Sequence, residues 1–371
     1  MTLPQFQAHF SNSASTGYTH FNNSGQSLIP DVNRDMALHW IERFYREGAF
    51  CSIEGWQQTE TTRKKLADFI GATSEEVSFF QTTASALSQV ASGIPLKPND
   101  EILVWDQEYP SNFYPWRKAA EASSARLVQI ESDNWSTPAE KILNRVTDKT
   151  RVIAVSWVQF QTGSVTDLRL LSQTLKGSGI WLVADVIQGV GVRPFNFQQS
   201  GFDAICGGSH KWLCSSFGAA YMAVKKERLA QLAPLEVGAM TYGTPDTPKS
   251  MTSQPKSDAS RYEPGTKSMV EIIALGATLD LFAKTGIENI FNEATRISEF
   301  LQSGLRDLKY KTIGNGPILN FSPANEKDID AIAKKLKAGK VSFARRGPGI
   351  RLSAHAYNTE ADALKVLSLL K

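Results

Sequence analysis

Short apolar runs alternate with helical stretches between residues 75 and 225. Several runs, such as Val152-Ile153-Ala154-Val155, are apolar at every position, which is typical of strands that are buried on both faces. Because strands that are separated by helices form parallel sheets, the pattern predicts a large α/β domain with a mostly parallel, seven-stranded sheet. The predicted strands are residues 77–80, 101–105, 126–131, 151–157, 180–185, 203–206 and 219–224. The predicted helices between them are residues 85–93, 112–122, 138–145 and 167–177.

The rest of the chain predicts a long loop, a helix and a second, smaller domain. Residues 236–267 are predicted to be irregular because they hold many glycines and prolines, including Gly238, Gly243, Pro245, Pro248, Pro255, Pro264 and Gly265. A connection of this length inside a compact domain is usually functional. A connecting helix is predicted at 268–285, and residues 286–371 show the order helix, strand, helix, strand, strand, helix. We therefore predict a large domain over residues 16–267 and a small α+β domain over 286–371, with residues 1–15 packed on the small one.

The composition is that of an ordinary globular protein of 371 residues, with 42% hydrophobic and 21% charged residues. Lys and Arg number 40 against 37 Asp and Glu, and the run Arg345-Arg346 is too short to make the concentrated basic face that nucleic acids require. No segment approaches the roughly 18 consecutive apolar residues of a membrane-spanning helix. The first basic residue is Arg34, so no basic signal region is indicated. We expect a cytoplasmic protein that binds neither nucleic acid nor a membrane.

The chain has three cysteines, Cys51, Cys206 and Cys214. Their positions show no CxxC and no Cys/His spacing of the kind that binds zinc. The sequence therefore predicts neither a disulfide framework nor a metal site.

An acidic residue and a lysine follow two neighbouring strands of the predicted sheet. Asp185 closes the buried run that starts at Ile180, and Lys211 follows a second strand that ends in Gly207-Gly208. Open α/β sheets bind their ligands at the carboxyl ends of the strands, so both side chains are expected at one edge. An Asp that pairs with a pyridinium nitrogen and a Lys that forms a Schiff base are what pyridoxal 5'-phosphate (PLP) chemistry requires. The combination is informative, because each residue alone is common in turns and caps.

Asp185-x-x-Gln188 followed by Ser209-His210-Lys211 resembles the class V aminotransferase family, whose members are fold-type I PLP enzymes. The likeness runs from Phe21-Asn-Asn-Ser-Gly25 to the segment 350–360. The resemblance implies that Lys211 forms the Schiff base with PLP, that Asp185 pairs with the ring nitrogen, and that Gln188 donates to the phenolic oxygen. It also implies a large domain and a small C-terminal domain of the fold-type I kind.

A strand that ends at Phe80 and a helix that follows it form a turn with free hydroxyl and N–H groups, which suits an anion. By resemblance this turn holds the PLP phosphate through Thr83 and Ala84. The resemblance adds Ser209 and His210 as side-chain contacts, with His210 also among the catalytic residues, and Tyr109 over the face of the ring. A half-buried core tyrosine is the alternative for Tyr109.

Arg351 stands in a strand-like run between apolar neighbours. A guanidinium holds a carboxylate through two parallel hydrogen bonds, and by resemblance Arg351 binds the substrate carboxylate, with Asn23 and Gly25 lining the same entrance. A solvent-facing strand arginine is the alternative. In the family, the segment that matches 261–266 crosses a dimer interface, so a homodimer is implied in which Thr266 contacts the phosphate of the partner's cofactor.

The sequence departs from its relatives at two positions that bear on the reaction. Cysteine desulfurases carry a nucleophilic cysteine shortly before the carboxylate arginine, and residues 335–351 contain none. Kynureninases have a tyrosine immediately before the lysine, where this chain has His210. We therefore predict an enzyme that acts on an α-amino acid through an external aldimine, an aminotransferase first and a C–S lyase or epimerase second. A non-catalytic PLP-binding module is the alternative from another class of protein function. A nicotinamide-dependent oxidoreductase is not supported, because it would require a GxGxxG turn after the first strand and the sequence has none there.

Overall fold

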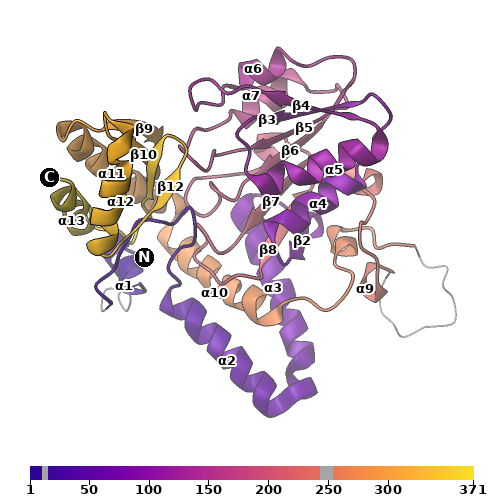
Figure 1. Ribbon diagram of the computed structural model, residues 1–371. Helices are drawn as coiled ribbons and strands as arrows, with labels where there is room; N and C mark the ends of the chain where they lie inside the picture. Colours follow the sequence, from indigo (N-terminus) through magenta and orange to yellow (C-terminus); the bar gives the residue numbers. More distant parts are fainter. Residues whose placement is uncertain (11–15, 243–253) are drawn as a thin grey trace.

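A seven-stranded sheet forms the centre of the larger part of the protein (Figure 1). The structure is a computed structural model that describes residues 1–10, 16–242 and 254–371. The strand order is β2-β8-β7-β6-β5-β3-β4, and all neighbours are parallel except for β8, which is antiparallel to both β2 and β7. The strands are β2 (Val77–Phe80), β3 (Glu101–Trp105), β4 (Arg126–Ile130), β5 (Thr150–Ser156), β6 (Trp181–Asp185), β7 (Ala204–Gly208) and β8 (Ala220–Val224). The predicted mostly parallel, seven-stranded sheet is confirmed.

Two hydrophobic layers cover the faces of this sheet because successive strand residues point to opposite sides. Ile102 and Val104 of β3 pack with α4 (Thr83–Gly93) and α5 (Tyr114–Ser123). Leu103 and Trp105 pack into the other layer, with α3 (Ser52–Ile70) and α10 (Met269–Thr285). Two shorter helices, α6 (Ala139–Leu143) and α7 (Leu168–Thr174), complete the crossovers.

Two long helices that the sequence pattern did not predict pack against α10, and the turn that joins them projects from this body. Helix α2 (Asp31–Glu47) and α3 are joined by the 3-10 turn Gly48–Cys51 and form a hairpin that is visible at the bottom of Figure 1. Their apolar periodicity is blurred because several large apolar side chains are exposed rather than buried, namely Leu38, Ile41, Tyr45, Phe50 and Ile53.

The C-terminal part is built on a four-stranded antiparallel sheet in the order β12-β13-β10-β9. Its elements are α11 (Ile287–Asp307), β9 (Lys311–Asn315), β10 (Ile318–Ser322), α12 (Ile329–Ala338), β11 (Val341–Ser342), β12 (Ala344–Arg346), β13 (Gly349–Ser353) and α13 (Glu360–Leu370). The predicted order omitted one strand before α12 and one after it. Strand β9 is half-exposed and contains Gly314, and β11 has two residues, so neither shows a clear strand pattern.

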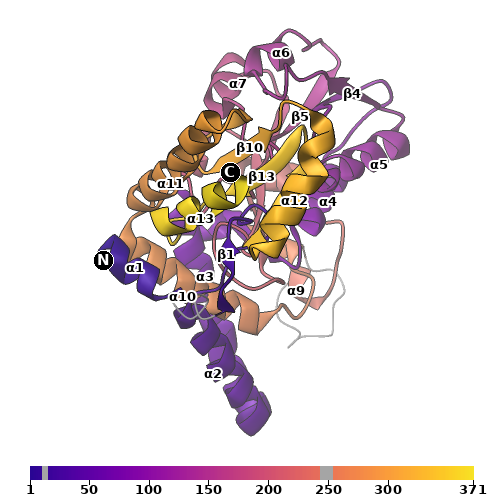
Figure 2. The ribbon, with the colours of Figure 1, turned by 60° about the vertical axis from the view of Figure 1, so that its left-hand side comes forward.

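The N-terminal residues lie between the two parts. Helix α1 (Leu3–Ala8) buries Phe6, whose ring lies 5.7 Å from that of Phe282 and 6.1 Å from that of His355. Further on, β1 (Thr19–His20) pairs in parallel with β11 of the C-terminal part. Figure 2 shows α1 against α10 and β1 in front of it. The domain boundaries stay a prediction, but residues 19–20 are hydrogen-bonded to the C-terminal part rather than to the large sheet.

Within the predicted irregular segment 236–267, the described residues contain two short helical turns, α9 (Ala239–Tyr242) and Ala259–Tyr262. Gly243, Pro245 and Pro248 lie outside the described residues. No helix in the described part of the chain is both long and apolar enough to cross a membrane.

Candidate active site

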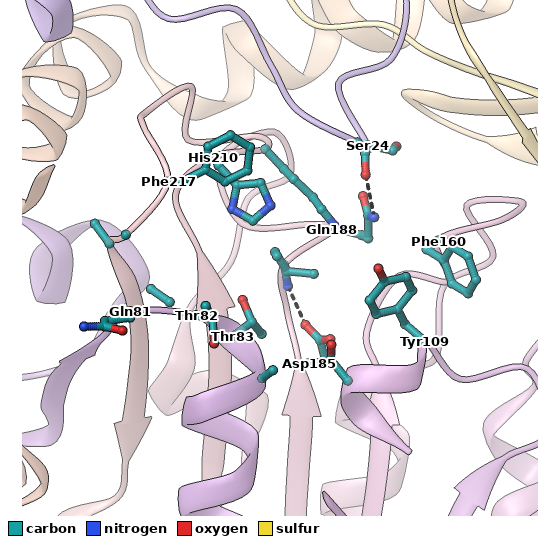
Figure 3. Close-up of a pocket in the computed structure, with 18 of the residues that line it drawn as sticks. Ser24, Gln81, Thr82, Thr83, Tyr109, Phe160, Asp185, Gln188, His210 and Phe217 are labelled. Carbon is teal, nitrogen blue, oxygen red and sulfur yellow. Dashed lines mark hydrogen bonds between the residues drawn. The ribbon is translucent and has the colours of Figure 1, made fainter. Parts of the chain in front are cut away.

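A cavity of about 480 Å³ opens at the edge of the large sheet where β2, β6 and β7 end (Figure 3). Both parts of the chain line it, since Ser24 and Gly25 after β1, Arg346 of β12 and Arg351 of β13 contribute alongside residues of the large sheet. The carboxyl ends of strands in an open α/β sheet are the usual place for a ligand. The predicted site residues that line this cavity are Gly25, Thr83, Ala84, Tyr109, Asp185, Gln188, His210, Lys211 and Arg351.

Asp185 and Lys211 are buried, with 3% and 9% of their surfaces exposed. Asp185 Oδ1 accepts a hydrogen bond of 2.9 Å from the Ile187 N–H group, which turns the carboxylate into the cavity (Figure 3). Burial raises the pKa of Asp185 to about 6, against the lowering effects of the Ile187 N–H group and of Lys211. Burial lowers the pKa of Lys211 to about 8, although Asp185 opposes this change. The pair therefore places an amine that is easily deprotonated beside a carboxylate.

The amide of Gln188 is held on both sides. Its Oε1 atom accepts a 2.9 Å hydrogen bond from the indole N–H of Trp212, and its Nε2 atom donates over 3.0 Å to the Ser24 carbonyl. An indole nitrogen only donates, so this partner determines which way the amide points. The second hydrogen of Nε2 has no partner among the described residues and is free to donate to a ligand.

The turn into α4 provides groups for an anion. Thr82 caps the helix and accepts from the Ser85 N–H group at 3.0 Å. The Thr83 hydroxyl is buried and has no hydrogen-bond partner in the described structure. A Cβ atom at Gly208 would lie 2.8 Å from Thr83 Oγ1, so the glycine leaves the space in front of this hydroxyl open. An unpartnered buried hydroxyl at a helix N-terminus fits the phosphate of PLP.

Ser209 differs from the prediction. It does not line the cavity, and its hydroxyl donates over 2.9 Å to the Ser216 carbonyl. The Ser209 side chain thus closes the loop that follows Lys211.

Aromatic rings stand on two sides of the cavity. The Tyr109 ring centre lies 5.5 Å from Lys211 Nζ and 5.1 Å from the ring centre of Phe160, at an interplanar angle of 80°. His210 stacks on Phe217, with 4.9 Å between the ring centres. Burial, with a smaller effect from Lys211, lowers the pKa of His210 to about 4, so its imidazole is neutral at pH 7. The sequence analysis did not single out Phe160 and Phe217. Phe160 comes shortly after the predicted strand 151–157, and Phe217 comes shortly after Lys211, so both follow elements that end at the predicted edge.

Arg351 extends from β13 into the cavity. It is 2% exposed, and it donates over 2.7 Å to the Phe160 carbonyl and over 3.0 Å to Asn22 Oδ1. Its Nε atom is buried without a partner in the described structure. Burial and the charge of Arg346 lower the pKa of Arg351 to about 9. The guanidinium is thus held in place and still has a donor to offer.

Asn23 is not a lining residue, contrary to the prediction. It is fully buried and donates over 2.7 Å to the Ser353 carbonyl, while Asn22 is the residue that holds Arg351. Asn22 pairs with Ser353 in an isolated bridge, and Asn23 lies in the turn that follows, which points its side chain into the interior. A Cβ atom at Gly25 would lie 2.8 Å from the Asn22 side chain, so the glycine leaves room for it.

Thr266 does not line this cavity either. It is exposed and lines an adjoining pocket of about 550 Å³, which shares Gln81, Ala84 and Gly218 with the first one. Within one chain it therefore lies next to the site without being part of it.

Glu108 is a half-buried residue near Asp185 that the sequence did not single out. Its oxygens accept from the Ser156 N–H group at 2.6 Å, from the Ser156 hydroxyl, and from Asn112 Nδ2 at 3.0 Å. Ser156 and Asp185 are register partners on β5 and β6. Burial raises the pKa of Glu108 to about 7, with a further contribution from Asp185. The second carboxylate could have been expected because it follows β3 at the same sheet edge.

This fold, with a buried Asp–Lys pair at the strand ends and an open helix turn beside it, defines a fold-type I PLP-dependent enzyme. The chain belongs to the class V aminotransferase family, since the family model Aminotransferase class-V matches residues 39–363.

Three relatives illustrate the range of that family. A probable cysteine desulfurase of Methanothermobacter thermautotrophicus is 24% identical, over 84% of this chain and 82% of the relative. The uncharacterized aminotransferase YcbU of Bacillus subtilis is also 24% identical, over 91% of this chain and 90% of the relative. A solved structure of C-DES, a cystine C–S lyase, has glycine covalently linked to its PLP cofactor; it superimposes with a TM-score of 0.89 at 20% identity and covers 98% of each chain.

Proposed function

We propose that this protein is a PLP-dependent aminotransferase that acts on an α-amino acid. The observation that carries the proposal is that Lys211, Asp185 and Arg351 line one cavity together with the unpartnered Thr83 hydroxyl. When bound, PLP supplies an electron-withdrawing ring that stabilises negative charge at the substrate α-carbon.

Each residue has a role that follows from its surroundings. Lys211 would hold PLP covalently through its amine and would move a proton at the substrate α-carbon, because its lowered pKa leaves a fraction of neutral amine. Asp185 would pair with the ring nitrogen, and Gln188 would donate to the ring oxygen with its free hydrogen. Thr83 and the first N–H groups of α4, with Ala84, would hold the phosphate. Tyr109 and His210 would provide flat surfaces for the ring, and Arg351 would bind the substrate carboxylate.

The cysteines favour transamination over persulfide formation. All three, Cys51, Cys206 and Cys214, are buried, and none lines the cavity. Burial raises the pKa of Cys206 and Cys214, which suppresses the thiolate that a nucleophile needs. A C–S lyase or an epimerase that uses no protein thiol is the second candidate, since it needs the same residues around the α-carbon.

The proposal is tested by the visible spectrum of the purified protein and a survey of amino acids added one at a time. A yellow band that appears with PLP supports the cofactor assignment. Transamination converts the amino acid to its 2-oxo acid and bleaches the band in one turnover without an acceptor. Sulfide and pyruvate from a cysteine derivative, or a D-amino acid without any 2-oxo acid, would instead identify a lyase or an epimerase.

Replacing Arg351 with lysine is expected to raise the apparent KM for the amino-acid substrate at least about tenfold. An ammonium group keeps the charge but cannot make two parallel hydrogen bonds or retain the contacts to Phe160 and Asn22. Steady-state kinetics provides the measurement, with Arg345→Lys as the control because Arg345 lies outside the cavity. An unchanged KM in Arg351→Lys would show that another group binds the carboxylate.

We also propose a homodimer in which each site is completed by Thr266 of the other chain. The segment before Thr266 is held rigidly, since the Tyr262 hydroxyl donates to the Leu229 and Leu232 carbonyls and Glu263 is paired with Arg63 and Lys267. Thr266 itself remains exposed beside the phosphate turn. The apolar side chains on the α2–α3 hairpin give a second copy further surface to bury.

The three free thiols support a cytoplasmic, reducing location.

Mixed dimers test this exchange. Thr266→Val is expected to weaken PLP retention without unfolding the protein, because it removes one hydroxyl and nothing from the core. Consider a dimer of one Lys211→Ala chain and one Thr266→Val chain. If Thr266 acts across the interface, this dimer has one intact site: the Thr266→Val chain provides its Lys211, and the Lys211→Ala chain provides its Thr266. Activity restored on mixing, toward half of the wild-type value, supports the exchange. A fully active monomer in light scattering would disprove it.

A further inference from the structure

Two arginines of the C-terminal sheet face the cavity from adjacent strands. In the antiparallel pair β12–β13, Ala344 is opposite Arg351 and Arg346 is opposite Gly349. Residues that are opposite each other share a face, and so do residues two apart on one strand. Arg346 and Arg351 are therefore diagonal neighbours on one face, and both line the cavity. Arg345 points to the other face, where it forms an ion pair with Asp330.

The position of Arg346 is fixed through its backbone. Asn320 Nδ2 donates over 2.8 Å to the Arg346 carbonyl and over 3.1 Å to the Gln161 carbonyl. Gly347 has a positive φ of 51°, and a Cβ atom there would lie 3.3 Å from the side chains of Gln161 and Trp135. This tight turn ties Arg346 to the same loop whose Phe160 carbonyl holds Arg351. The Thr83 turn belongs to a different wall of the cavity, at the start of α4.

The cavity has more positive than negative charge. Lys211, Arg346 and Arg351 line it, and among the described residues Asp185 is the only carboxylate that does. Arg346 has no carboxylate partner among the described residues, and the hydrogen bond that it makes is to the Arg345 carbonyl at 2.9 Å. Its charge also lowers the pKa of both Arg351 and Lys211. Three cations at one site repel each other unless anions accompany the ligand.

We infer that the substrate is an amino acid with a second acidic group in its side chain. Arg351 binds the α-carboxylate, and Arg346 binds the side-chain carboxylate from the neighbouring strand. The two guanidinium groups then meet two anions, and the planar fork of each suits a carboxylate. This inference rests on the proposed function, because it assigns the substrate class of the same site.

The test compares diacids with monoacids of the same carbon number on the PLP-loaded protein. Succinate and glutarate are titrated against butyrate and pentanoate by isothermal calorimetry, and the shift of the visible PLP band is followed in parallel. At least one diacid is expected to bind at least about tenfold more tightly than its monoacid. Arg346→Ala should remove that preference and leave monoacid affinity unchanged. Arg345→Ala is the matched control, since it removes the same charge one residue away on the opposite face.

Four results would overturn the inference. The wild type could show no preference for diacids. Alternatively, Arg345→Ala and Arg346→Ala could lose that preference equally, which would mean that the overall positive charge of the region, and not a contact with Arg346, attracts the diacid. Arg346→Ala could weaken the binding of monoacids and diacids alike, which would mean that Arg346 and Arg351 bind the same carboxylate. It could also release PLP, which would place Arg346 on the phosphate. Failure of the proposed function would look different. A protein that binds no PLP would show no visible band. A protein that prefers diacids but acts as an epimerase or a lyase would disprove transamination and still confirm the substrate class.

Discussion

Lys211→Ala is expected to lower kcat by at least about a thousandfold and to abolish covalent attachment of PLP. In the described part of the chain, Lys211 is the only lysine that lines the cavity. Burial gives it a pKa of about 8, so that much of it is a neutral amine under mildly alkaline conditions. The attachment is measured by borohydride reduction followed by mass spectrometry, which should find the pyridoxyl group on Lys211. Noncovalent binding of PLP should survive, because Thr83 and the N-terminus of α4 are unchanged.

Lys226→Ala is the control, since Lys226 is exposed and lies outside the cavity. It should match the wild type in rate and in labelling. The unfolding free energy of Lys211→Ala should not fall by much, because a buried ammonium with a lowered pKa contributes little to folding. A pyridoxyl group recovered on another lysine would contradict the assignment.

Asp185→Asn is expected to reduce kcat well beyond tenfold while the protein becomes more, not less, stable near pH 7 without cofactor. In the proposed role the carboxylate would keep the cofactor nitrogen protonated, and the amide could not do so. A loss of no more than about tenfold, or roughly 1.4 kcal/mol, would mean that Asp185 has no such role.

The stability change has a defined pH dependence. The folded-state pKa of Asp185 is raised from 3.8 to about 6, so the folded protein binds more protons than the unfolded chain between these values. Stability is therefore lost as the pH rises through that window, by about 3 kcal/mol in total. Asn does not titrate, so denaturant unfolding should show the largest gain of the variant over the wild type above pH 6 and little gain near pH 4. Equal differences at both pH values would contradict this account.

The hydrophobic pattern was sufficient for the large sheet and its principal chemistry. Strands such as β3 and β6 are buried at every position, so their apolar runs are unambiguous, and the seven strands were placed within two residues of their observed ends. Asp185 and Lys211 could be predicted because the ends of neighbouring strands meet at one edge whatever the details of packing. The α2–α3 hairpin escaped prediction since its apolar residues face outward as well as inward.

Which side chains enter the cavity was decided by register and by contacts between distant segments. Asn22 rather than Asn23 reaches Arg351 because Asn22 forms a bridge to Ser353 whereas Asn23 lies in the turn that follows, and Ser209 donates to the Ser216 carbonyl. Arg345 and Arg346 are adjacent and chemically identical in the sequence. The pairing of β12 with β13 sends one to Asp330 and the other into the cavity. The local pattern determines which elements form. Successive side chains of a strand point to opposite faces, so a shift of the strand pairing by one residue moves each side chain from the cavity to the other face. Only the tertiary pairing of the strands sets that register.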